Sequence, residues 1–101
     1  MTQFILKSDA VFDNRSHRLC VIRRGEIKDG LANRRLAVIK DDVIKDEHSN
    51  RIIGKLNGNN ILDANGKKLT TISDVRKILK DSDMMDPAYL AAIWIVCLSK
   101  Y

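Results

Sequence analysis

The chain has 101 residues, of which 45% are hydrophobic, so it is long enough to form one domain without disulfide bonds or a structural metal. Lysine and arginine outnumber aspartate and glutamate by 18 to 13, and the resulting net charge of +5 favours anionic partners only mildly, because both signs are interleaved along the chain. The first ten residues contain no basic segment followed by a long apolar stretch, which is unlike a secretory signal. We therefore expect a single cytoplasmic domain over residues 1–101.

Four segments between residues 9 and 73 share one pattern. Each has an aliphatic residue two positions before an aspartate, then a polar turn, one or two basic residues, and two aliphatic residues three positions apart. The aspartates recur at intervals of 16, 17 and 17 residues, and they are Asp13, Asp29, Asp46 and Asp63. The polar centres of the segments are typical of β-hairpin turns. Four units of about 17 residues therefore predict four hairpins, or about eight short strands, in a meander or flower-like array.

The aliphatic residues that end each unit conflict with a regular strand. Leu19 and Ile22 lie three positions apart, as do Leu36 and Ile39, and an odd spacing places such a pair on opposite faces of a strand. Either both faces are partly covered, or a β-bulge lies between the two residues. The third and fourth units, which end in IIGKL and LTTI, are also less apolar than the first two.

Residues 74–101 change to a helical pattern. Ser73 is a plausible N-cap for a short helix over residues 73–80, in which Val75, Ile78 and Leu79 have helical spacing. A second helix is predicted to begin at Asp86, with Pro87 at its first position. The mainly β (α+β) repeat array is thus expected to end in a helical segment.

The second helix contains an apolar run of 11 residues, 88–98, which is shorter than the ~20 residues that cross a bilayer. No membrane span is therefore expected. A helix with its side chains is ~10 Å wide or more and does not fit inside a closed eight-stranded barrel. The helix must instead cover the hairpins or contact a second copy of the chain. Because it is apolar on all sides, we expect a homo-oligomer, with contacts at Leu90, Ile93, Trp94 and Leu98.

The four hairpin units, each with an aspartate and a basic–aliphatic step, followed by an apolar C-terminal segment, resemble the bacterial four-fold β-flower domain. The resemblance covers about residues 9–73. It implies a flower-like architecture, and, because the family has no assigned activity, it implies no catalytic residue.

Candidate sites follow from the repeat. The aspartates could form a carboxylate cluster for a cation or for acid–base chemistry, but each is followed at once by turn residues and is better explained as the organiser of its own turn. His17 and His48 occupy different repeat positions, and no third ligand accompanies them, so they are interpreted as solvated turn residues and no metal site is predicted. Seven cations follow the hairpin turns and could bind phosphates on one rim, or they could keep the turns soluble. They are Arg15, Arg18, Arg34, Arg35, Arg51, Lys67 and Lys68.

Signatures of catalysis and of cofactor binding are missing from the sequence. No serine lies in a nucleophile elbow, and no glycine-rich phosphate loop is found. Cys20 and Cys97 are 77 positions apart and are interpreted as small buried hydrophobic residues. Aromatic residues are not interleaved with the cations, which weakens a nucleic-acid function.

These observations favour a non-enzymatic interaction module that associates with itself through its C-terminal helix, has no cofactor and has a protein partner that the sequence does not identify. One alternative is polyanion binding, to nucleic acid or phosphate headgroups, through the seven cations. A second alternative is a metal-dependent or hydrolytic enzyme, which only the four repeat aspartates support.

Overall fold

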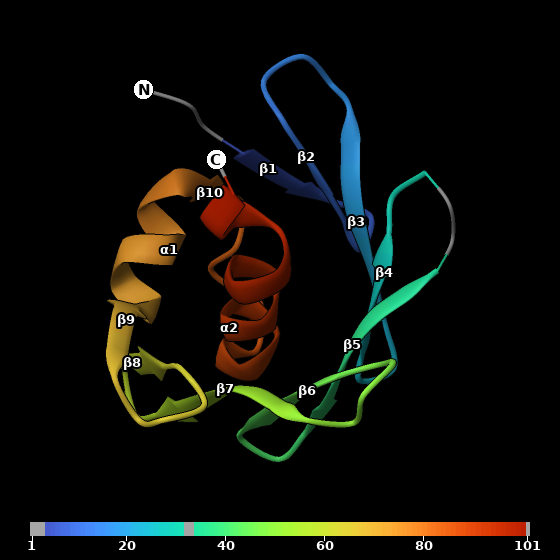
Figure 1. The fold of residues 1–101 in the computed structure, drawn as a ribbon. Coiled ribbons are helices and arrows are strands. Elements are labelled where there is room, and N and C mark those ends of the chain that lie inside the picture. The colour runs from blue at the N-terminus through green and yellow to red at the C-terminus, as the bar shows by residue number, and fades with distance from the viewer. Residues whose placement is uncertain (1–3, 32–33, 101) are drawn as a thin grey trace.

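The computed structural model describes residues 4–31 and 34–100, in which one curved sheet surrounds a helix (Figure 1). Ten strands are present in this part of the chain, in the sheet order β10-β1-β2-β3-β4-β5-β6-β7-β8-β9. The predicted mainly β class is confirmed. The strands are β1 (Phe4–Lys7), β2 (Ala10–Phe12), β3 (Arg18–Arg23), β4 (Glu26–Asp29), β5 (Arg35–Lys40), β6 (Val43–Asp46), β7 (Ile52–Asn57), β8 (Asn60–Leu62), β9 (Lys68–Thr71) and β10 (Leu79–Lys80).

Strands β1 to β9 form an antiparallel meander, and β10 is added in parallel to β1. The sheet therefore contains two strands beyond the eight that the four hairpin units predict. Strand β1 precedes the first unit, and β10 follows the helix α1 (Ile72–Ile78). The parallel pair Phe4↔Leu79 joins two segments that are distant in sequence, which is why no local pattern could indicate it.

A β-bulge interrupts each of the four hairpins that contain a repeat aspartate. In the first hairpin Val11 pairs with Cys20 and Phe12 with Arg18, so Leu19 is the extra residue on β3. The same shift occurs between β4 and β5, between β6 and β7 and between β8 and β9. A bulge is thus present, as one of the two alternatives predicted, but it lies at Leu19 itself and not between Leu19 and Ile22. Because bulges bend a strand and increase its twist, they help the sheet to curve.

Next to three of the four bulges, a branched residue lies opposite a small one. Val11 pairs with Cys20, Ile27 with Ala37 and Ile44 with Gly54, and all six residues are buried. A Cβ atom on Gly54 would overlap with Cδ1 of Ile95 in the helix α2 (Pro87–Val96). The less apolar third unit therefore has a steric explanation, since its glycine makes room for the helix.

The connections of the meander lie alternately at the two ends of the strands, and each row of strand ends is here called an edge. One edge, here called the short-turn edge, has two-residue turns at positions 8–9, 24–25, 41–42 and 58–59. The other, here called the long-turn edge, has the connections that follow the repeat aspartates. At the short-turn edge the closing aliphatic residues donate their N–H groups to turn carbonyls; Ile22, for example, donates to the Asp9 oxygen at 2.7 Å. Ile39, Leu56 and Ile72 make corresponding bonds of 2.6–2.8 Å.

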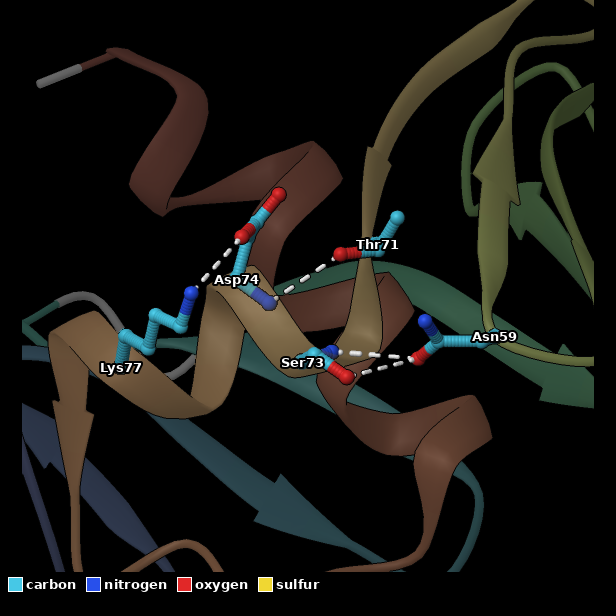
Figure 2. A network of polar contacts seen from close by, with 5 residues as sticks. All are labelled: Asn59, Thr71, Ser73, Asp74 and Lys77. Atoms are coloured by element: carbon cyan, nitrogen blue, oxygen red, sulfur yellow. Dashed lines mark hydrogen bonds and ion pairs between the residues drawn. The ribbon is translucent and has the colours of Figure 1, made fainter.

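The N-cap of the first helix lies two residues earlier than the sequence indicated. Figure 2 shows that the hydroxyl of Thr71 accepts the N–H of Asp74 at 3.1 Å, so Thr71 and not Ser73 is the N-cap of α1. Ser73 instead donates its N–H and its hydroxyl to Oδ1 of Asn59, at 3.1 and 3.3 Å. Asn59 thereby ties the start of α1 to the last short turn. The helix ends at Ile78 rather than at Lys80, because Leu79 and Lys80 form β10.

Helix α2 lies inside the curve of the sheet, and α1 stands across the opening between β9 and β10 (Figure 1). Asp86 is the N-cap of α2, and its Oδ1 accepts the Ala88 N–H at 2.9 Å. Pro87 is the first residue of this helix. A short 3₁₀ turn, η1 (Leu98–Lys100), follows. The described part of the chain contains no helix of the length and apolarity needed to cross a membrane.

The argument that α2 needs a second copy for its burial was wrong. Leu90 and Ile93 are fully buried by the chain itself, and Leu98 is 3% exposed. A single flat sheet face could not reach these residues, but a curved sheet together with α1 covers the helix from several sides.

Candidate functional site

The repeat aspartates lie in separate turns, where each accepts backbone N–H groups. Oδ1 of Asp13 accepts from Arg15 and His17 at 2.8 and 2.9 Å, and Oδ1 of Asp63 accepts from Asn65 and Lys67 at 2.9 and 2.8 Å. Asp29 and Asp46 accept from Leu31 and Ser49 in the same way, each at 2.9 Å. The interpretation of the aspartates as turn organisers is confirmed. Within the described ranges no three His, Cys, Asp or Glu residues are grouped as metal ligands would be.

Two of these carboxyl groups have a lowered pKa. The hydrogen bond from the His17 backbone is the main cause for Asp13, and that from the Ser49 backbone is the main cause for Asp46. Both bonds favour the ionised form. The two histidines are exposed, as expected, and Nδ1 of His17 lies 3.4 Å from Oδ2 of Asp13.

The seven predicted cations, here called the basic rim, are all exposed, and they flank the connections of the long-turn edge. Two of them have structural partners. Nε of Arg18 donates to the Gly30 carbonyl at 2.8 Å. Arg35 forms ion pairs with Glu26 at 2.9 Å and with Glu47 at 2.7 Å. These two side chains link adjacent hairpins, which leaves Arg15, Arg34, Arg51, Lys67 and Lys68 as the members without such a role in the described contacts.

The four residues of α2 and η1 predicted to contact a second copy have different environments. Leu90, Ile93 and Leu98 are buried within the chain, so they do not reach a surface where a partner could bind. Trp94 is half-buried and packs against the core.

An open cleft of ≈ 980 Å³ includes two of the short turns and reaches Glu26 and Lys28, which neighbour Arg35 of the basic rim. Its lining comes from the β1–β2 turn, the β3–β4 hairpin, the loop 81–86 and the first turn of α2. The apolar part of the lining is formed by Leu6, Ile22, Met84, Met85 and the ring of Tyr89, and the charged part by Asp9, Arg23, Arg24, Glu26, Lys28, Asp81 and Asp86.

The hydroxyl of Tyr89 connects helix and sheet in this cleft. Its oxygen accepts the N–H of Gly25 at 2.7 Å, across the β3–β4 turn. This turn has two successive residues with positive φ, Arg24 at 40° and Gly25 at 79°. Because the oxygen acts as acceptor, the hydroxyl proton of Tyr89 is available for a further acceptor. The bond thus fixes the turn that presents Arg24 and leaves a donor at the cleft.

Arg76 of α1 holds the loop that forms one wall of the cleft. Its guanidinium donates to the carbonyl oxygens of Ser82 at 2.7 Å, Asp83 at 2.8 Å and Met85 at 3.3 Å. Ser82 is buried, and its hydroxyl donates to the Leu79 carbonyl at 2.7 Å. The wall is therefore anchored by four hydrogen bonds.

Two of the four cleft carboxylates already have partners. Glu26 is paired with Arg35, and Asp86 caps α2. For Asp9 and Asp81, no side-chain hydrogen bond or ion pair is found among the described residues. The cleft lining thus contains three cations, Arg23, Arg24 and Lys28, and two carboxylates without such a partner.

Sequence reasoning missed this cleft because its parts are far apart along the chain. In the predicted pattern, residues 23–26, RRGE, only join the first two repeat units, and residues 81–85, which precede the predicted helix start at Asp86, have no predicted role. Two adjacent arginines before a glycine were the one local signal, since they place cations on a tight turn.

Cys20 and Cys97 are also brought together. Cys20 is in β3 and Cys97 is the C-cap residue of α2, and both are buried, as expected. A hydrogen bond with the Cys97 side chain, followed by burial, raises the pKa of the Cys20 thiol. The thiol thus remains protonated and has the low reactivity of a core residue.

Comparison of the chain with protein-family models, with curated proteins and with solved structures gave no match.

Proposed function

We propose that the protein is a non-enzymatic interaction module that binds its partner in the cleft at the short-turn edge. The observation that carries this proposal is the construction of the cleft, which has both apolar and charged side chains in its lining and lies between a turn held by Tyr89 and a loop held by Arg76. Binding sites are concave and largely preformed, with a few polar groups that fix orientation. The cleft meets this description, and its side chains Arg23, Arg24 and Lys28 make no side-chain hydrogen bond or ion pair among the described residues.

The test is a titration of ¹⁵N-labelled protein with a mixture of acetylated, amidated pentapeptides of varied sequence, up to about 5 mM total, followed by NMR. The backbone amides of Asp9, Gly25 and Tyr89 are expected to shift. Those of Asn14 and Asn65, at the long-turn edge, serve as internal controls and should not move. Shifts confined to the long-turn edge, or no shifts at all, would contradict the proposal.

Polyanion binding by the basic rim is the second candidate, favoured by the exposure of all seven cations along one edge. Arg34→Gln with Arg51→Gln should weaken heparin binding, and the wild-type affinity should fall steeply with salt. Arg35 is left intact in this variant because its two ion pairs stabilise the sheet. If the wild type does not bind heparin at low salt, this candidate fails.

We further propose that the four hairpins form a four-fold β-flower closed by the apolar helix. This architecture is supported by the recurrence of the aspartate turn bonds and of the bulge in successive units. The corresponding bonds of the closing aliphatic residues give further support.

A further inference from the structure

The donors of the cleft point to the chemistry of its ligand. Arg24 is exposed on a turn with positive φ, and Arg23 and Lys28 lie on the two strands of the same hairpin. With the hydroxyl proton of Tyr89, they give four donor groups from one hairpin and one helix turn. Guanidinium and ammonium groups form their strongest hydrogen bonds with carboxylates and phosphates.

The carboxylates and the size of the cleft favour a polypeptide over a small or polymeric anion. Asp9 and Asp81 would repel a nucleic acid or an anionic lipid surface, but they can accept N–H groups of a peptide backbone. The volume of ≈ 980 Å³ lies at the upper end of the range for small-molecule sites. Met84 is 97% exposed beside the half-buried Met85, and methionine side chains adapt readily to apolar groups of a partner.

We propose that the cleft binds a short polypeptide segment that carries a carboxylate next to a bulky apolar side chain. The carboxylate lies against Arg24, Lys28 and the Tyr89 hydroxyl, and the apolar side chain lies against Leu6, Ile22 and Met85. This assignment rests on the proposed function, because it names the partner chemistry of the same cleft.

The experiment uses three acetylated, amidated pentapeptides and the same NMR readout. The first has a central glutamate–leucine pair between glycines, the second replaces the glutamate with glutamine, and the third replaces the leucine with alanine. The first peptide is expected to shift the amides of Asp9, Gly25 and Tyr89. The glutamine and alanine peptides should each bind about tenfold more weakly, and octanoate alone should bind no better than they do.

Protein variants locate the contact. Arg24→Gln and Lys28→Gln should each weaken the first peptide about tenfold, whereas Asp9→Asn should strengthen it. Lys77→Gln is the matched control, because Lys77 is exposed on α1 and is only loosely paired with Asp74 at 3.7 Å. The affinity of the Lys77→Gln variant for the first peptide should stay within about twofold of the wild-type affinity, because an exposed ion pair contributes little.

The outcomes separate this inference from the proposed function. If the glutamine peptide shifts the cleft amides as strongly as the glutamate peptide, the cleft binds peptides but the carboxylate assignment is wrong. If octanoate binds as tightly as the peptide, the polypeptide assignment is wrong. If no member of a varied peptide mixture shifts these amides, both the inference and the proposed function fail.

Discussion

At the scale of single residues, the side chains that recur in the sequence serve their own turns. Asp63 accepts two backbone N–H groups within its hairpin and contacts no site elsewhere in the described structure. The recurrence of an acidic residue could have indicated a shared site, but each carboxylate is satisfied locally. A repeated polar residue at a turn is thus explained by the donors that the turn exposes.

Asp63→Ala should lower the free energy of unfolding by about 0.5–2 kcal/mol, because it leaves two turn N–H groups without their acceptor. Urea unfolding followed by circular dichroism measures the change. Asp63→Asn retains an acceptor oxygen and should cost less. If alanine and asparagine cost the same, the hydrogen bonds are not the reason for the aspartate.

Stability should also depend on pH through Asp13 and Asp46. The pKa of each carboxyl is lowered in the folded protein below its ordinary value of 3.8, so the unfolded chain takes up protons first as the pH falls. Their stabilising contribution is therefore complete above that value and is lost as the pH falls through the lowered pKa. Urea midpoints between about pH 5 and about pH 2 measure this loss.

The variant Asp13→Asn with Asp46→Asn should show a shallower decline over the same acidic range, since positions 13 and 46 no longer have a titrating carboxyl. Asp83→Asn, at an exposed position, should follow the wild-type profile. A double variant that declines as steeply as the wild type would contradict the assignment.

At the scale of secondary-structure elements, hairpins are tied to one another by close backbone contacts at the long-turn edge. Gly30 donates its N–H to the Leu19 carbonyl at 3.2 Å and accepts from Nε of Arg18 at 2.8 Å. A Cβ atom at Gly30 would lie 2.6 Å from the Arg18 carbonyl carbon. The glycine thus allows the first two hairpins to approach each other.

Gly30→Ala should lower the free energy of unfolding by about 3 kcal/mol, because backbone atoms would have to move to relieve the overlap. Gly58→Ala is the control: its φ is +62°, and nothing lies within 4 Å of the added methyl group, so only backbone strain of about 1 kcal/mol is expected. Chemical denaturation compares the two. If both variants lose the same free energy of unfolding, the close contact between Gly30 and Arg18 does not explain the need for glycine at position 30.

At the scale of the whole molecule, the apolar helix is enclosed by its own chain. Strands that are far apart in sequence and α1 cover Leu90 and Ile93 completely. Self-association therefore stays a prediction, and of the four predicted contact residues only Trp94 is still partly exposed.

Light scattering at about 50 μM should give a mass above the 11.5 kDa of one chain for the wild type and a monomer mass for Trp94→Glu. Leu31→Glu is the control, since Leu31 is 89% exposed at the long-turn edge. It should leave the assembly unchanged. A monomer mass for the wild type at this concentration would contradict the predicted self-association.

The sequence by itself determined the elements whose signals are local. The aspartate turns, the bulge as one of two explanations of the Leu19–Ile22 spacing, and the start of α2 at Asp86 and Pro87 all depend on neighbouring residues, and periodicity and capping chemistry are sufficient to predict them.

Only the tertiary structure decided how these elements close. The pairing of β1 with β10, the position of α2 inside the sheet, and the cleft between Arg24, Tyr89 and the loop 81–86 join residues that are up to about eighty positions apart. Such contacts depend on the accumulated twist and bulging of many strands. A short sequence pattern does not indicate the total curvature of the sheet. The burial of α2 was therefore wrongly attributed to a second copy of the chain.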